Sequence, residues 1–233
     1  MIAWSYSKLR LAKNRNYAYY LQYIKKIKAK VNKSIIMGNI YHYICDTANS
    51  QKMSLENANI YTIKAILSQS KYADIMDPQE ILVHAPSMEN YLKILRQFKY
   101  PYSESELNFG LTTSSEIVDF FDPQVKFRGI IDFISIGEKT VIIDLKTSYY
   151  KDQWDQLDYY TLYPKIKYPL YGGIYSLTEG KMYWKNILHK KTLAELQPTF
   201  DKYETMQEFL PNYAYCNICL LATKCDAVKQ ISQ

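Results

Sequence analysis

Hydrophobic residues follow a strand-like pattern in the middle of the chain. Residues 126–136 and 140–147 are rich in Ile, Val and Phe, and the residues 137–139 between them are a glycine and two charged residues. Two such runs around a short glycine-containing segment predict a β-hairpin. Val141-Ile-Ile143 is a continuous apolar run, which is typical of a strand buried on both faces of a sheet.

Helical spacing predominates in other parts of the chain. Ser54 is a suitable helix cap and is followed by Ile60, Ile63 and Leu67 at helical spacing. The other expected helices cover residues 7–30, 36–48, 87–95 and 200–210, and the other expected strands cover residues 106–112, 171–177 and 181–188. This mixture predicts an α/β fold in which helices flank a central mixed β-sheet.

The length of 233 residues allows one large domain with a sizeable core. We expect a single domain over residues 1–233, with N-terminal helices at about 1–50 and a C-terminal cysteine segment at about 211–233. No apolar run approaches the roughly 20 residues that a membrane-spanning helix needs, and no signal peptide is recognised. A cytoplasmic protein is therefore expected.

The net charge of +6 arises from 29 basic and 23 acidic residues. Part of the excess is a run of lysines beside three tyrosines: Lys25, Lys26, Lys28, Lys30 and Lys33 with Tyr19, Tyr20 and Tyr23. Such a run is commonly a solvated face. It could also follow a nucleic-acid backbone while the tyrosine rings stack on bases.

The predicted hairpin carries two aspartates and a lysine. If the turn centres on Glu138, Asp132 lies opposite Asp144 with Cβ atoms roughly 5 Å apart, and Lys146 points to the same face as Asp144. Two adjacent carboxylates repel each other unless a cation lies between them, and oxygen ligands favour Mg²⁺ or Mn²⁺. Lys146 would then activate a water molecule or stabilise a phosphate. The alternative is an exposed hairpin with ordinary solvated side chains.

A helix of about eleven residues is expected from Asp152 to the residues before Pro164, because acidic residues begin it and a proline follows it. Gln156 and Tyr160 are four residues apart and share one helix face. They follow Lys146 closely enough for the helix to fold back over the two aspartates.

These motifs together resemble the PD-(D/E)xK nuclease superfamily, and in particular its RecB-like branch. The residues that carry the resemblance are Gly129-x-x-Asp132, Asp144-x-Lys146 and Gln156-x-x-x-Tyr160, with Gly38-x-x-x-His42 and the Ser5 to Tyr20 segment upstream. The resemblance implies a restriction-endonuclease-like core and a metal-dependent nuclease. His42, Asp132, Asp144 and the backbone carbonyl of Leu145 would bind the metal, and Gln156 and Tyr160 would hold the lysine and the phosphate. A lone histidine is otherwise more often structural.

The reaction expected from the resemblance is exonucleolytic hydrolysis of single-stranded or end-bearing DNA, with a helicase or recombination partner as a further expectation. Two other functions are weighed against it: an endonuclease that cuts within duplexes or at particular structures, and a catalytically weak nucleic-acid-binding subunit. The intact set Asp132, Asp144 and Lys146 argues against the weak subunit.

The four cysteines form a second pattern. Cys216-x2-Cys219-x5-Cys225 lies near the C-terminus, and its spacing is similar to that of the AddB-like and CRISPR-adaptation nucleases, in which three such cysteines and one N-terminal cysteine hold a [4Fe–4S] cluster. The N-terminal cysteine of those proteins falls near Arg15, whereas the remaining cysteine of this chain is Cys45. Zinc binding and free buried thiols are the alternatives. The pattern suggests a reducing compartment rather than disulfides.

Overall fold

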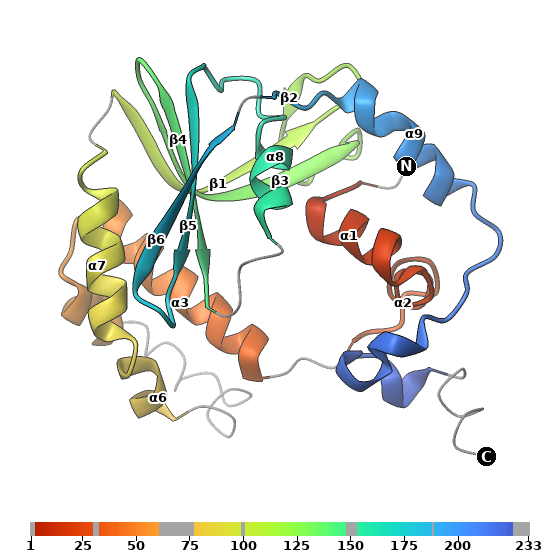
Figure 1. Ribbon diagram of the computed structural model, residues 1–233, viewed down its shortest axis with the longest axis horizontal. Coiled ribbons are helices and arrows are strands. Elements are labelled where there is room, and N and C mark those ends of the chain that lie inside the picture. Colours follow the sequence, from red (N-terminus) through yellow and green to blue (C-terminus); the bar gives the residue numbers. More distant parts are fainter. Residues whose placement is uncertain are drawn as a thin grey trace. The chain divides into compact units, whose positions relative to one another are not determined.

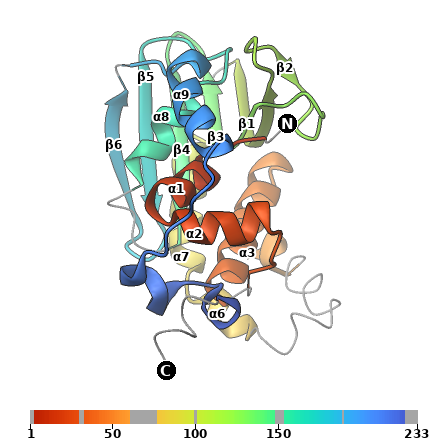
Figure 2. The ribbon, with the colours of Figure 1, turned by 90° about the vertical axis from the view of Figure 1, so that its right-hand side faces the viewer.

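The centre of the fold is a six-stranded mixed β-sheet (Figure 1). The computed structural model describes residues 3–29, 33–60, 77–98, 101–147, 153–187 and 189–225. The strand order is β2-β1-β3-β4-β5-β6, and Figure 2 shows the strands side by side. β4 and β5 are parallel, whereas β3–β4 and β5–β6 are antiparallel. The strands are β1 (Tyr102–Leu111), β2 (Ile117–Val118), β3 (Phe127–Ile136), β4 (Thr140–Lys146), β5 (Leu170–Ser176) and β6 (Lys181–Ile187). The predicted fold, a central mixed sheet flanked by helices, is confirmed.

The residues group into two compact units, which are described separately. The hairpin unit comprises Lys33–Phe109 and Ile130–Lys191, and the terminal unit comprises Met1–Asn32, Gly110–Gly129 and Thr192–Gln233. The expectation of a single domain stays a prediction.

In the hairpin unit, α3 (Lys33–Ser50) and α7 (Ala85–Leu95) pack on one face of the sheet. Ile40, Ile44 and Ala48 recur every four residues along α3 and are buried in the same core as Ile143 and Leu145 of β4. Because β4 lies between two other strands and is covered, its apolar run is buried along nearly its whole length, as predicted.

The other face of the sheet is covered by α8 (Trp154–Tyr160). Gly172 of β5 allows this close packing, because a Cβ atom there would lie 2.8 Å from Leu157 Cδ1 and 2.7 Å from Ile187 Cδ1. Leu157 itself is buried. The glycine therefore determines how near α8 can approach β5.

The terminal unit has an aromatic core around Trp4. The Trp4 ring stacks on Tyr19 and on Phe200, with ring centroids 5.6 Å apart in each case. Its Nε1 donates a hydrogen bond of 2.7 Å to Glu204, whose carboxylate also pairs with Lys126 at 2.7 Å. Tyr19 is fully buried in this core, so it is not available to stack on a nucleic-acid base.

Several helix boundaries differ from the prediction. The helix expected at 7–30 is divided into α1 (Tyr6–Asn14), α2 (Asn16–Tyr19) and a π-helical turn (Tyr20–Ile24), because Arg15 leaves the helical conformation at φ −145°; residue 30 lies outside the described residues. The last helix, α9, is Leu193–Glu204 rather than 200–210, because Thr192 and Glu195 form a capping box that starts it earlier.

The helices near Ser87 and Asp152 also begin elsewhere. α7 starts at Ala85, and Ser87 Oγ donates to the carbonyl of Leu177 (2.7 Å) instead of capping the helix. α8 begins at Trp154 and is shorter than expected, and residue 152 lies outside the described residues.

Other predicted elements agree more closely. The predicted helix 36–48 corresponds to α3, and the predicted strand 106–112 corresponds to β1. The predicted hairpin 171–188 corresponds to β5 and β6, and residue 188 lies outside the described residues. The helix after Ser54 begins as predicted, but Ile63 and Leu67 lie outside the described residues. A short helix, α6 (Pro78–Leu82), was not predicted.

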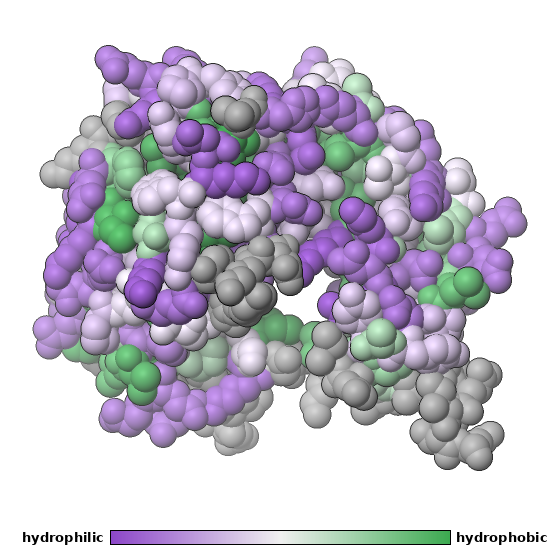
Figure 3. Space-filling model, viewed as in Figure 1, coloured by the Kyte–Doolittle hydropathy of each residue, from purple (hydrophilic) through white to green (hydrophobic). Residues whose placement is uncertain are grey.

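Hydrophilic residues predominate on the face of the molecule that Figure 3 shows, and hydrophobic residues are scattered among them in small groups. Among the described helices, none combines the length and the apolar character that a membrane span requires.

Candidate active site

The β3–β4 hairpin has the register that the sequence predicts. Phe133 pairs with Ile143 and Ile136 with Thr140, so the turn is centred on Glu138. The same register continued by one residue brings Asp132 opposite Asp144. Asp132 Oδ2 also accepts a hydrogen bond of 2.6 Å from the backbone N–H of Leu145, which ties the two strands together at this point.

Asp144 is a buried carboxylate, with 1% of its surface exposed. Its Oδ1 accepts a hydrogen bond of 3.1 Å from the Tyr160 hydroxyl. Its Oδ2 lies 2.6 Å from Lys146 Nζ, as an ion pair that lacks hydrogen-bond alignment. A buried charge is costly without compensation, and the Lys146 ammonium supplies that compensation for Asp144.

Lys146 is held by α8. Its Nζ donates to Gln156 Oε1 at 2.9 Å, and Gln156 Nε2 in turn donates to the Tyr160 hydroxyl. Burial, and after it the charge of Asp144, raise the pKa of Tyr160 well above its usual range, so the phenol stays protonated and can donate to Asp144. The four residues therefore form a closed ring of contacts, with Gln156 and Tyr160 on one helix face as predicted.

Asp132 also belongs to a group of three side chains that could hold a metal ion. One ligand atom from each of His42, Glu106 and Asp132 lies within 4.8 Å of the other two. His42 Nδ1 is 3.2 Å from Glu106 Oε1 and 3.5 Å from Asp132 Oδ1. Burial lowers the pKa of His42, but Asp132 and then Glu106 more than offset this effect and raise it to about 9. Burial raises the pKa of Asp132 above its usual range, and the positive charge of His42 opposes that rise.

Glu106 was missed in the analysis of the sequence. It belongs to β1, where nothing in the spacing of polar residues singles it out. It lines one small pocket together with His42, Asp132 and Leu145, and only the folded arrangement of β1, α3 and β3 brings these residues together.

Comparison with known families decides the classification. Residues 3–226 match the family described as the PD-(D/E)XK nuclease superfamily. The chain belongs to the PD-(D/E)XK nuclease superfamily.

Comparisons with individual proteins give less information about function than the family match does. A solved structure titled "Crystal structure of SSO0001" is 13% identical in sequence, with a TM-score of 0.43 over 95% of this chain and 93% of that chain. The search of the curated proteins gives no match.

Membership of the PD-(D/E)XK superfamily implies a metal-dependent nuclease that acts on DNA, and nucleases of this superfamily use Mg²⁺ or Mn²⁺. Three donors of this chain fit such an ion: carboxylate oxygens from Asp132 and Glu106, and one imidazole nitrogen from His42.

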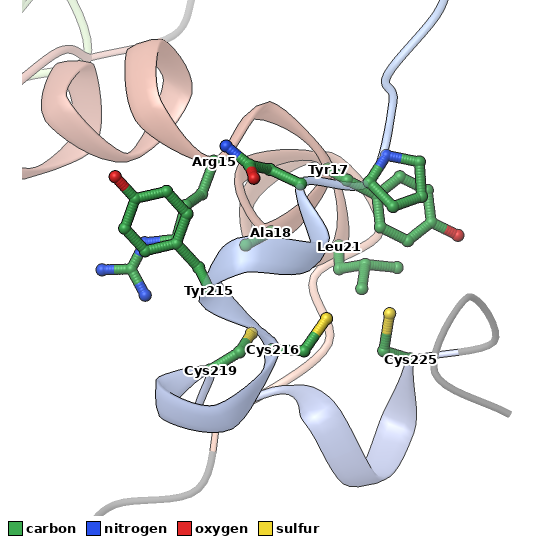
Figure 4. Close-up of a pocket in the computed structure, with 10 residues that line it drawn as sticks. Arg15, Tyr17, Ala18, Leu21, Tyr215, Cys216, Cys219 and Cys225 are labelled. Carbon is green, nitrogen blue, oxygen red and sulfur yellow. The ribbon is translucent and has the colours of Figure 1, made fainter. Parts of the chain in front are cut away.

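The cysteines of this PD-(D/E)XK nuclease lie in two settings. In the terminal unit, Cys216, Cys219 and Cys225 line one pocket, and Figure 4 shows their sulfur atoms on the side of the segment that faces Ala18 and Leu21. In the hairpin unit, Cys45 is buried in the core of α3 and lines the small pocket beside His42. Burial, followed by the charges of Asp132 and Glu106, raises the pKa of the Cys45 thiol, which disfavours a thiolate.

Arg15 lines the same pocket as the three C-terminal cysteines, and its guanidinium lies over the Tyr215 ring (5.3 Å from the carbon to the centroid). Leu21, Leu221 and Cys225 form a small buried cluster beside it. A role as ordinary core thiols therefore has structural support, and the four-cysteine cluster stays a prediction.

Proposed function

We propose that the chain is a RecB-like exonuclease that hydrolyses phosphodiester bonds of single-stranded or end-bearing DNA. One observation carries the proposal: the closed ring Asp144–Lys146–Gln156–Tyr160 adjoins the His42, Glu106 and Asp132 group within the hairpin unit. This combination supports hydrolysis because it joins a candidate cation site to a partly buried, oriented lysine.

Each side chain would have a definite task. Asp132, Asp144, His42 and the Leu145 carbonyl would bind the divalent ion, which supplies Lewis-acid polarisation and a more acidic bound water. Lys146 would hold the attacking water or the scissile phosphate, because its ammonium lies 2.6 Å from Asp144 and is held by Gln156. Tyr160 would keep Asp144 in place by donating its hydroxyl proton to a hydrogen bond.

The test is a cleavage assay with the purified full chain on end-labelled linear and on circular single-stranded DNA, in Mg²⁺, Mn²⁺ or EDTA. We expect metal-dependent loss of the linear substrate, no cleavage of the circle, and no activity in EDTA. Cleavage of the circle, or of closed duplexes, would identify an endonuclease instead. No cleavage of any substrate, with metal still bound, would identify a catalytically weak binding subunit.

Asp144→Ala and Lys146→Ala provide the matched inactive variants. Each removes charge compensation at the phosphate, which is commonly worth several kcal/mol of transition-state stabilisation. Activity should fall by at least about a hundredfold, since about 1.4 kcal/mol corresponds to tenfold. Full activity in a folded variant would refute the site.

We also propose that Cys216, Cys219 and Cys225 hold a [4Fe–4S] cluster, with Cys45 as the remaining thiol for the fourth position. The three cysteines line one pocket, which supports a shared metal site for either a cluster or a zinc ion.

Iron and zinc analysis after anaerobic purification tests this second proposal. The wild-type chain should be brown and contain iron, and Cys216→Ser should lose the iron. If Cys45→Ala keeps the full iron content, Cys45 is a core thiol and the fourth ligand lies elsewhere. A colourless wild-type chain with stoichiometric zinc would replace the cluster with a zinc site.

A further inference from the structure

Glu106 has a backbone conformation that is unusual for its residue type. It lies inside strand β1 with a φ of +51°. A residue with a Cβ atom is disfavoured in this left-handed region, which glycine and asparagine tolerate better. Residues held in this way persist where the surrounding structure over-determines them, and they cluster at functional sites.

The conformation changes the direction of the side chain. Consecutive residues of a regular strand point to opposite faces, yet Ser105 and Glu106 both line the pocket beside α3. One extra residue on the same side is what a β-bulge produces. Asn49 Nδ2 donates to Ser105 Oγ at 2.7 Å and Asn108 Nδ2 donates to the Glu106 carbonyl at 3.0 Å, so the arrangement is held on both sides.

The redirected carboxylate meets the candidate ligands of the ion. Glu106 Oε1 lies 3.2 Å from His42 Nδ1, and one ligand atom from each of these residues lies within 4.8 Å of a carboxylate oxygen of Asp132. The Asp132 side chain is only 10% exposed. Asp144 is not one of these three residues, and its Oδ2 is paired with Lys146 Nζ at 2.6 Å. The pocket thus gathers an imidazole and two carboxylates close enough together to bind one ion.

We propose that Glu106 is a direct ligand of the catalytic divalent cation, directed to it by its left-handed backbone conformation in β1. This inference rests on the proposed function, because the ion is the one used for DNA cleavage. An ion bound here would take over the contacts that His42 Nδ1 now makes with Glu106 and Asp132. The additional carboxylate favours a hard divalent cation, Mg²⁺ or Mn²⁺.

Calorimetric titration of the full chain with MnCl2, without DNA, tests the proposal. Glu106→Gln removes the charge and keeps the shape, and it should weaken Mn²⁺ binding by at least about tenfold, in the range found when groups around a metal site are removed. Glu104→Gln is the matched control on the same strand, because the Glu104 carboxylate instead accepts from the Tyr102 hydroxyl. It should bind Mn²⁺ within about twofold of wild type.

Glu106→Gly provides a second measurement that does not depend on the ion. Glycine accepts the φ of +51°, so the metal-free variant should melt at the wild-type temperature or above it, while its Mn²⁺ affinity falls. A lower melting temperature together with unchanged Mn²⁺ affinity would show that Glu106 is a structural residue and overturn the proposal.

The two proposals fail in different ways. If wild type cleaves DNA with Mn²⁺ and Glu106→Gln binds Mn²⁺ as wild type does, the ligand role of Glu106 is wrong and the nuclease stands. If wild type binds Mn²⁺ through Glu106 but cleaves no DNA, the ligand role stands and the nuclease function is wrong.

Discussion

Tyr160 donates a hydrogen bond of 3.1 Å from its hydroxyl to Asp144 Oδ1, and so connects helix α8 to the buried end of strand β4. The same hydroxyl accepts a hydrogen bond from Gln156, which in turn holds Lys146. One phenol therefore fixes the position of a candidate metal ligand and, through Gln156, that of the candidate catalytic lysine. Sequence spacing predicts that Gln156 and Tyr160 share a face, but this double role follows from the atomic contacts.

Tyr160→Phe should lower the rate of cleavage without unfolding the chain. The ring remains in the core, but Asp144 and Gln156 each lose a partner, and loss of such supporting contacts typically costs about 10- to 100-fold in activity. The free energy of unfolding should fall by only about 1 kcal/mol, the usual net contribution of one hydrogen bond. Tyr159→Phe, at the next position of α8, is the control and should keep wild-type activity. Equal activity in both variants would show that the Tyr160 hydroxyl does not support the site.

His42→Ala should raise the Mn²⁺ concentration that half-maximal cleavage requires. The reason is that the variant lacks the imidazole, which lies 3.5 Å from Asp132 and 3.2 Å from Glu106. A metal titration of the cleavage rate and a melting curve of the metal-free protein are compared. A lower melting temperature with an unchanged metal requirement would mean that His42 is structural.

Gly172→Ala should destabilise the chain by about 1–3 kcal/mol, as overpacking of a core does. The added methyl group would meet Leu157 Cδ1 at 2.8 Å and Ile187 Cδ1 at 2.7 Å, so these buried side chains, or α8 with them, would have to shift. Gly38→Ala is the control, because its nearest neighbour, Thr147 Oγ1, would be 3.6 Å away and alanine favours the helix. Denaturant unfolding measures both, and an unperturbed Gly172→Ala variant would contradict the tight packing of α8.

Lys8 should make the stability of the chain depend on alkaline pH. Burial, and after it the charge of Arg128, lower the pKa of Lys8 to about 8, whereas an unfolded lysine titrates near 10.4. Between these values the unfolded chain binds the proton that the folded chain has released, so the stability contributed by this group rises with pH across the window. Below pH 8 both states are protonated, and the cost of burying the charge is fully present.

Lys8→Met removes this titration. The melting temperature of wild type relative to Lys8→Met should therefore increase between pH 7.5 and pH 9.5. Comparing the two proteins in the same buffers cancels the other titrating groups, such as Tyr19, whose pKa is raised to about 12 by burial and then by Glu204. A constant difference across the window would mean that the Lys8 ammonium is not desolvated in the fold.

The sequence alone determined the hairpin and its chemistry, because these depend on local patterns. The apolar runs, the turn at residues 137–139 and the period of two along a strand were enough to predict that Asp132 lies opposite Asp144 and that Lys146 shares its face. The four-residue spacing of Gln156 and Tyr160 likewise predicted a shared helix face. The apolar periodicity failed at helix ends, where a capping box at Thr192 and the non-helical backbone of Arg15 outweighed it.

Only the tertiary structure decided which distant residues complete the site. Glu106 reaches His42 because a left-handed backbone turn in β1 redirects its side chain, and such a turn leaves no mark in the spacing of the sequence when glycine is absent. Tyr19, which the sequence offers as a base-stacking residue, is instead enclosed by Trp4 in the aromatic core of the terminal unit. Burial and direction depend on contacts between segments far apart in the chain, and local periodicity contains no information about them.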